Sequence, residues 1–169
     1  MQRKKLTLIT FTAVLTTIVF VLTAYLHIPS HAGFVHIGDG VIYLAACMLP
    51  LPYALFVGAV GGALADLLSG FAIWAPGTVI IKASGVLFFT RKRNFISVRN
   101  ALGLIPASLI CVVGYYLYDA LIIGNFVSAL AGIPGYAMQC ILSSALFIVC
   151  GVSLDKIGFK KKVLGDIKK

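Results

Sequence analysis

The chain has 169 residues, of which 60% are apolar and 11% are charged, and its mean hydropathy is +1.04. Because a soluble domain carries about 25% charged residues, this composition excludes an ordinary soluble protein and predicts one all-α integral membrane domain over residues 1–169. The net charge of +9 does not indicate nucleic-acid binding, because the basic residues flank apolar segments, where they set topology and meet anionic lipid.

Six apolar stretches follow one another along the chain, and each is a candidate transmembrane helix. About 20 apolar residues cross a bilayer, and fewer suffice where protein shields the ends of the helix. The first stretch is longer than the apolar region of a signal peptide, so we expect a retained helix. The second and fourth are short, and partial re-entry of one of them is an open alternative. The predicted spans are 6–26, 37–49, 53–71, 78–90, 101–123 and 135–154.

The distribution of Lys and Arg predicts how these spans are oriented. Thirteen of the fourteen lie before the first span, between the fourth and fifth spans, or after the sixth. The predicted outer loops, 27–36, 72–77 and 124–134, contain none. Because cytoplasmic loops carry an excess of Lys and Arg, we expect about six crossings with both termini in the cytoplasm.

The remaining cation, Lys82, lies in the apolar interior together with three acids, Asp39, Asp66 and Asp119. A charge at mid-bilayer costs at least about 2.5–3.5 kcal/mol on insertion scales, so it is usually paired, faces a cavity or serves function. Counting about 1.5 Å per residue from the predicted helix ends places all four groups, with Gln139, in the outer half of the membrane. We therefore predict a polar, partly hydrated pocket open to the outside, with Asp66 as the resting partner of Lys82.

Aromatic and amide side chains near the same level are further candidates for ligand binding. Tyr43 and Trp74 are expected to form walls, and the alternative for Trp74 is an interfacial aromatic belt. Asn125, Gln139 and His36 are candidates for hydrogen bonds to the ligand. Small-molecule sites are mostly apolar with a few placed polar groups, so this set predicts a planar ligand that stacks on an aromatic ring.

Motifs for catalysis, metal binding and ATP hydrolysis are missing from the sequence. The histidines of the first outer loop match no compact metal site, and the four cysteines form no C-x-x-C pair. Neither G-x-S-x-G nor the phosphate-binding pattern G-x-x-x-x-G-K-[ST] occurs. We therefore expect no metal, no cofactor and no enzymatic activity in this chain.

Small residues mark where helices are expected to touch. Gly58, Gly61 and Gly62 crowd the third span, together with Ala63 and Ala65. Side chains this small let two backbones approach closely in a membrane. The third span is therefore predicted to pack tightly against its neighbours.

Three runs of the sequence resemble a known family of membrane proteins. They are VHIGDGVIYLAA over 35–46, GAVGGALADLLSG over 58–70 and APGTVIIK over 75–82. Together they look like the substrate-binding S component of energy-coupling factor (ECF) vitamin transporters, nearest the branch of hydroxymethylpyrimidine and riboflavin types. The similarity is densest over 35–85, while the size and the six-helix layout extend it to the whole chain.

The resemblance implies a vitamin-binding protein with an outward-facing pocket that the first outer loop closes. A transmembrane T component and two cytoplasmic ATPases would complete the transporter in the plasma membrane of a prokaryote, where the S component topples to deliver its ligand. In this family the first helix carries an A-x-x-x-A docking motif, whose nearest equivalent here is Ala13-x-x-x-Thr17. The metal-binding N-terminal His of the cobalt and nickel branch is replaced by Met1-Gln2, which argues against a metal as ligand.

The expected ligand is a small heteroaromatic vitamin or precursor, with hydroxymethylpyrimidine or a thiamine-related compound as the first prediction. Riboflavin, pyridoxine and a queuine-type substrate are alternatives within the same class of protein. Outside that class, the alternatives are a non-transport membrane scaffold and a small intramembrane enzyme. A scaffold predicts no ligand, and an enzyme predicts turnover without ATPase subunits.

Overall fold

The computed structural model describes residues 2–30 and 33–163. Its larger helices are α1 (Gln2–Ala24), α2 (Gly38–Met48), α3 (Leu51–Leu68), α4 (Ala75–Val86), α5 (Val98–Ile123) and α7 (Ile133–Lys156). Shorter elements are the strands β1 (His27–Ser30) and β2 (Gly33–His36), the 3₁₀ turns η1 (Ala72–Trp74) and η2 (Leu130–Gly132), and the helices α6 (Phe126–Ala129) and α8 (Phe159–Val163).

The larger helices coincide with the six predicted apolar stretches. Four helical segments are long and apolar enough to cross a membrane: Lys4–Ala24, Leu51–Leu68, Val98–Ile123 and Phe126–Lys156. The prediction of an α-helical integral membrane protein is confirmed. The helices α2 and α4 are shorter, and their crossing of the membrane stays a prediction.

Proline and glycine mark several helix boundaries. Pro52, Pro76 and Pro134 occupy the first turns of α3, α4 and α7, where a missing backbone N–H leaves no hydrogen bond unmade. Gly124 ends α5 with a φ of 70°, a backbone conformation that glycine adopts without steric cost. These residues fix where each helix begins or ends.

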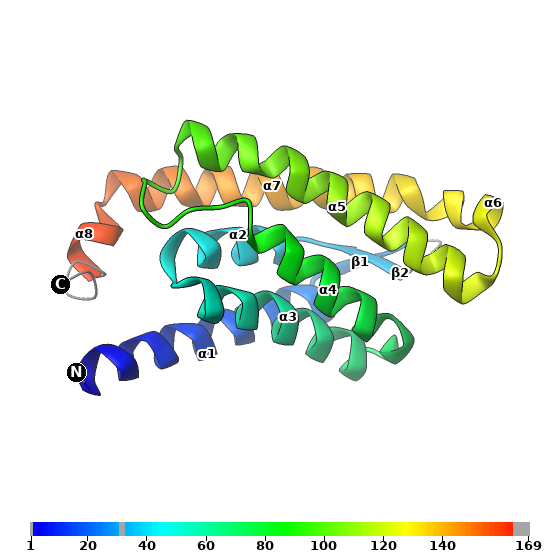
Figure 1. The fold of residues 1–169 in the computed structure, drawn as a ribbon, viewed down its shortest axis with the longest axis horizontal. Coiled ribbons are helices and arrows are strands. Elements are labelled where there is room, and N and C mark those ends of the chain that lie inside the picture. The colour runs from blue at the N-terminus through cyan, green and yellow to red at the C-terminus, as the bar shows by residue number, and fades with distance from the viewer. Residues whose placement is uncertain (1, 31–32, 164–169) are drawn as a thin grey trace.

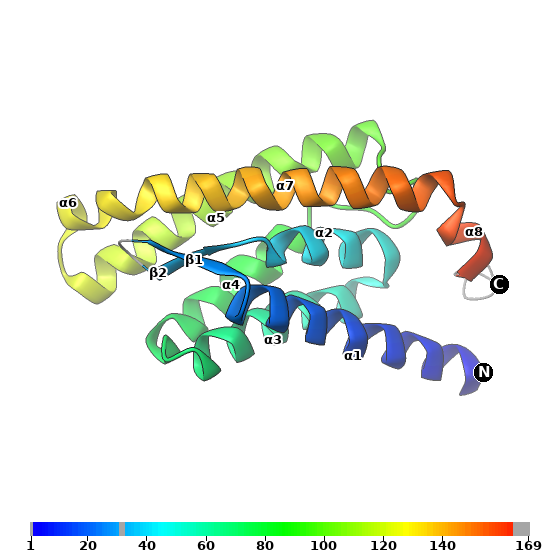
Figure 2. The ribbon, with the colours of Figure 1, turned by 180° about the vertical axis from the view of Figure 1, so that it is seen from behind.

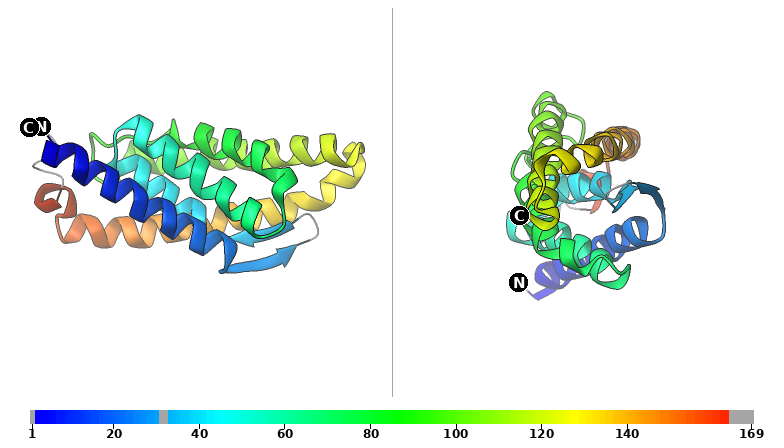
Figure 3. Two further views of the ribbon diagram at one scale, coloured as in Figure 1. Left: turned by 90° about the horizontal axis from the view of Figure 1, so that it is seen from below. Right: turned by 90° about the vertical axis from the view of Figure 1, so that its right-hand side faces the viewer.

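The helices form an antiparallel bundle in which each large helix runs opposite to the one before it (Figure 1). α2 lies at the centre, in contact with α1, α3, α4 and α7, and every one of its residues is buried. The end-on view of Figure 3 shows the other helices arranged around it. The start of α1, the connection between α4 and α5, and α8 lie toward one end of the bundle, whereas η1 and α6 lie at the other.

The first outer loop contains a β-hairpin that the sequence did not predict. β1 and β2 pair antiparallel, with His27 opposite His36 and Ile28 opposite Val35. β1 contacts α1 and β2 contacts α7, so the hairpin lies across the bundle between them (Figure 2). The segment is short and contains turn-forming residues, and its strands depend on pairing with each other and on the contact of β2 with the distant helix α7 rather than on a local pattern.

Glycines allow the close helix contacts that the sequence predicted around α3. A Cβ on Gly61 would lie 2.8 Å from Val19 of α1, and one on Gly62 would lie 2.7 Å from Thr78 of α4. Both distances are shorter than van der Waals contact, so any larger residue would push the helices apart. The predicted tight packing of α3 is confirmed.

Candidate functional site

A buried ion pair joins α4 to α2 in the middle of the bundle. Lys82 Nζ lies 2.7 Å from Asp39 Oδ1 and donates a hydrogen bond of 2.8 Å to Asp39 Oδ2. The residues are 5% and 1% exposed, respectively. The predicted pairing of Lys82 with Asp66 is therefore wrong. Estimating depth from helix ends gave the level of each group, but not the direction in which each helix turns its side chains.

Two further side chains complete the surroundings of Asp39. Gln139 of α7 donates a hydrogen bond of 3.0 Å to Asp39 Oδ2. The thiol of Cys111 on α5 lies 3.9 Å from the same oxygen and 3.6 Å from Gln139 Nε2. Asp39 also sits in the first turn of α2, where the helix dipole favours a negative charge. We call Asp39, Lys82, Cys111 and Gln139 the central cluster.

A small closed cavity adjoins the central cluster. Its volume is about 10 Å³, room for a single water molecule at most. It is lined by Asp39, Ile42, Tyr43, Ile81, Lys82, Gly85, Ala107 and Cys111. The predicted wall residue Tyr43 is buried and stacks on Phe89, with ring centroids 4.7 Å apart. A vitamin-sized molecule fits this cavity only if helices or side chains move.

A second polar group lies nearer the end of the bundle that carries η1. Asp119 is fully buried and accepts hydrogen bonds from Trp74 Nε1, at 2.7 Å, and from the hydroxyl of Tyr136. We call Trp74, Asp119 and Tyr136 the outer cluster. It ties η1 to α5 and α7 through the half-buried Trp74, whose place in an interfacial aromatic belt stays an alternative.

Tyr115 and Thr78 connect the two clusters. The Tyr115 ring stacks on Tyr136 at 5.1 Å between centroids, and Lys82 Nζ lies 5.0 Å from the Tyr115 ring centroid. The Tyr115 hydroxyl lies 2.9 Å from Thr78 Oγ1, within hydrogen-bond distance. The stacked rings and the cation above one of them form a continuous path of contacts between Lys82 and the outer cluster.

Asp66 is also buried, at 6% exposure, and forms no ion pair with Lys82. Its Oδ2 has no hydrogen-bond partner within residues 2–30 and 33–163. A buried carboxylate oxygen without a donor is costly. Asp66 therefore has one carboxylate oxygen with the capacity to accept a further hydrogen bond.

His36 closes the hairpin against the start of α2. Its Nδ1 accepts a hydrogen bond of 3.2 Å from the backbone N–H of Gly38 and lies 3.5 Å from the hydroxyl of Thr23. Burial lowers the pKa of the His36 imidazole to about 3, so the ring is neutral at physiological pH. Its observed contacts position the chain just before Asp39. No group of three or more His, Cys, Asp or Glu suited to a metal occurs in the described part of the chain.

Asn125 does not join either cluster. Its side chain is exposed, and its Oδ1 accepts hydrogen bonds from the backbone N–H groups of Val127 and Ser128, which caps α6. Ala13 and Thr17 lie exposed on α1, with the Thr17 hydroxyl bonded to the Ala13 carbonyl at 3.0 Å. Their predicted role in docking a partner stays a prediction.

Thr78 and Cys111 were not predicted as site residues, yet each lies one helical turn from a residue that was predicted or from its neighbour in the clusters. Thr78 precedes Lys82 by four residues on α4, and Cys111, Tyr115 and Asp119 follow one another at the same interval on α5. Residues four apart lie on one helix face. That spacing was the available signal for the role of Thr78 and Cys111.

Comparison with known proteins gives two matches. A family model described as "ECF-type riboflavin transporter, S component" matches residues 3–156. A protein of Pyrococcus woesei, named "Uncharacterized protein in gap 3'region", is 34% identical over 91 residues, which are 52% of this chain and 60% of that protein. The alignment thus covers less than two thirds of the relative's length.

Proposed function

The chain belongs to the family of S components of ECF-type riboflavin transporters, and from this premise we propose that it is the substrate-binding subunit of an ATP-driven vitamin transporter. The resemblance seen in the three sequence runs agrees with that membership. The proposed role is capture of the vitamin, with no reaction catalysed by this chain.

The observation that carries the proposal is the central cluster, a group of polar side chains from four helices inside an apolar bundle. Lys82 supplies N–H donors, Asp39 and Asp66 supply acceptors, and Gln139 supplies both. A planar heteroaromatic ring carries N–H groups and ring nitrogens or carbonyl oxygens on its edge, which match this set. Tyr43 and Tyr115 lie beside the cluster and offer ring faces for stacking.

The ligand is proposed to replace contacts that the protein makes with itself. In the closed conformation, Lys82 and Gln139 both bond to Asp39. A ligand that inserts between them takes over these hydrogen bonds, so no buried charge is left without a partner. Asp66 Oδ2 accepts an additional hydrogen bond from the ligand. Opening of the β1–β2 hairpin, which contacts α1 and α7 and leads directly into α2, would provide the entry path.

Riboflavin is the ligand to test first, because the matching family is described by that vitamin. Its ring system contains a pyrimidine ring with N–H and C=O groups on one edge. Hydroxymethylpyrimidine, the first prediction from the sequence, presents a single aminopyrimidine ring, whose edge carries ring nitrogens and an amino group in place of the C=O and N–H groups. Both rings offer hydrogen-bond donors and acceptors to Asp66, Lys82 and Gln139, and the volume of the opened site decides between them.

The proposed partners are a transmembrane T component and two ATPase subunits in the plasma membrane of a prokaryote. The chain itself carries no nucleotide-binding motif, so energy must come from another subunit. The exposed Ala13 and Thr17 on α1 are the proposed docking positions. Both termini and the connection between α4 and α5 would face the cytoplasm, since the Lys and Arg segments gather toward that end of the bundle (Figure 1).

Isothermal titration calorimetry on the purified full chain tests the proposal. The panel comprises riboflavin, hydroxymethylpyrimidine, thiamine, pyridoxine and queuine. We expect one of them to bind with 1:1 stoichiometry and Lys82→Met to abolish that binding. Lys92→Met removes an exposed cation outside the cluster and should leave affinity unchanged. A folded protein that binds nothing in the panel would refute the proposal.

A further inference from the structure

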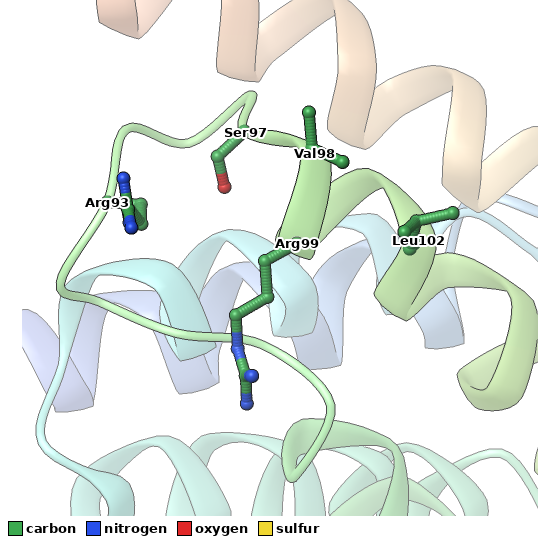
Figure 4. Close-up of a pocket in the computed structure, with 5 residues that line it drawn as sticks. All are labelled: Arg93, Ser97, Val98, Arg99 and Leu102. Atoms are coloured by element: carbon green, nitrogen blue, oxygen red, sulfur yellow. The ribbon is translucent and has the colours of Figure 1, made fainter.

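A second, much larger pocket lies at the opposite end of α5 from the outer cluster. It is an open hollow of about 550 Å³ lined by Arg93, Ser97, Val98, Arg99 and Leu102. Figure 4 shows Arg93 and Ser97 extending from the loop before α5, Arg99 from the first turn of the helix, and Val98 and Leu102 on the side away from Arg93. One side of the pocket is therefore cationic and the other is apolar.

The loop that carries Arg93 is held in place by buried hydrogen bonds. The side chain of Asn100 bonds to backbone groups of Thr90, Asn94 and Phe95. Asp155 of α7 accepts from the backbone N–H groups of Phe95, at 3.0 Å, and Ile96, at 2.8 Å. A loop fixed by this many contacts presents its side chains in a defined place, which a binding site needs.

Lys160 of α8 adds a further restraint. It donates to the Arg93 carbonyl and lies 4.4 Å from the centroid of the buried Phe95 ring. The tail thus packs on the loop from the side of α7, and both carboxylate oxygens of Asp155 are used by the backbone. Within the described ranges the ion pair is that of Lys82 with Asp39, so neither Arg93 nor Arg99 is paired with an acid there.

The apolar side of the pocket continues along α5. Val98 is 79% exposed, and Leu102, Ile105 and Leu109 remain largely exposed in the following turns. In a membrane helix such a stripe faces lipid tails. The hollow therefore joins two arginines at the membrane boundary to an apolar track that leads into the bilayer.

We infer that this pocket binds one anionic phospholipid, with its phosphodiester between Arg93 and Arg99 and its acyl chains along Val98 and Leu102. Arginine forms paired hydrogen bonds to phosphate oxygens. The N-terminus of α5 adds a favourable dipole at the same place. Basic pockets beside transmembrane helices are known to hold lipid headgroups of this charge. The inference is independent of vitamin binding in the central cluster.

Native mass spectrometry of the full chain, released from detergent after titration with dioleoyl phosphatidylglycerol, tests this inference. The test variant is the double substitution Arg93→Gln/Arg99→Gln. The matched control is Arg91→Gln/Lys92→Gln, which removes the same charge from exposed positions of the same loop that do not line the pocket. Thermal melting in detergent verifies that both variants are folded.

We expect the test variant to retain about tenfold less phosphatidylglycerol than wild type, while the control stays within about twofold. Phosphatidylcholine should show weak retention that neither variant changes. Equal losses in the two variants, or no loss in either, would overturn the inference. Displacement of the lipid by an equimolar amount of inorganic phosphate would also overturn it, because a free anion lacks the chains that the apolar side should hold.

Discussion

The central and outer clusters each contain a buried carboxylate, and the two carboxylates have different kinds of partner. Asp39 meets a cation, Lys82, together with an amide, Gln139. Asp119 meets two neutral donors, the indole of Trp74 and the hydroxyl of Tyr136. The first arrangement contains a charge pair that a polar ligand is able to interrupt, whereas the second holds three structural elements together without a counter-ion.

This difference assigns distinct roles to residues that look alike in the sequence. The central cluster borders a cavity and is surrounded by ring faces, so its contacts are exchangeable. The outer cluster joins η1, α5 and α7 through the hydrogen bonds that Trp74 and Tyr136 donate to Asp119. We therefore propose that the central cluster recognises the ligand and that Asp119 holds the neighbouring helices together.

The largest expected effect comes from breaking the charge pair. Lys82→Met leaves Asp39 buried without its cation, and removal of one partner of a buried pair costs about 3–5 kcal/mol of stability. Thermal melting in detergent should show a clear loss, and calorimetry should show no vitamin binding. The double variant Asp39→Asn/Lys82→Met should recover much of the stability but none of the binding. Full recovery of binding in the double variant would contradict the assigned role.

A smaller effect is expected in the outer cluster. Asp119→Asn keeps the shape but leaves one of the two donors without an acceptor, because the amide offers a single oxygen; an unsatisfied buried group costs about 1–3 kcal/mol. Stability should fall, while the dissociation constant of the ligand rises by less than about tenfold. Trp74→Phe serves as the milder companion, since it removes one donor and keeps the ring. Loss of binding in a stable Asp119→Asn protein would show that Asp119 touches the ligand.

The sequence predicted most of the bundle because membrane helices leave a strong signal. The apolar stretches correspond to α1–α5 and α7, and the glycines of α3 lie where helices touch, since both features follow from local composition. The hairpin escaped prediction because β2 packs against α7, which is distant in the sequence. No local pattern in 27–36 reveals that contact.

The site was predicted in part, and the missing part has a geometric reason. Depth along each helix brought Asp39, Lys82 and Gln139 to one level, and the structure joins all three. Depth does not give the rotation of a helix, so Asp66 was expected where Asp39 lies. Asn125 was expected beside the ligand because it is polar and near the outer end, yet a polar residue at a helix start is more often a cap.

The smallest effect is expected at Asn125, which tests that distinction. Asn125→Ala removes the cap of α6 and should cost about 1 kcal/mol or less, because the helix is short and exposed. Vitamin affinity measured by calorimetry should stay at the wild-type value. A drop in affinity without loss of stability would return Asn125 to the binding site.

The most direct test of the central claim is a structure of the chain with its vitamin bound. We predict that the heteroaromatic ring lies within hydrogen-bond distance of Lys82 and of Asp39 or Asp66. The direct contact between Lys82 Nζ and the Asp39 carboxylate should be broken, with the two side chains more than about 4 Å apart or bridged by the ligand. The Trp74–Asp119–Tyr136 contacts should persist in the same structure. A vitamin bound elsewhere, with the Asp39–Lys82 pair intact and unoccupied, would contradict the account.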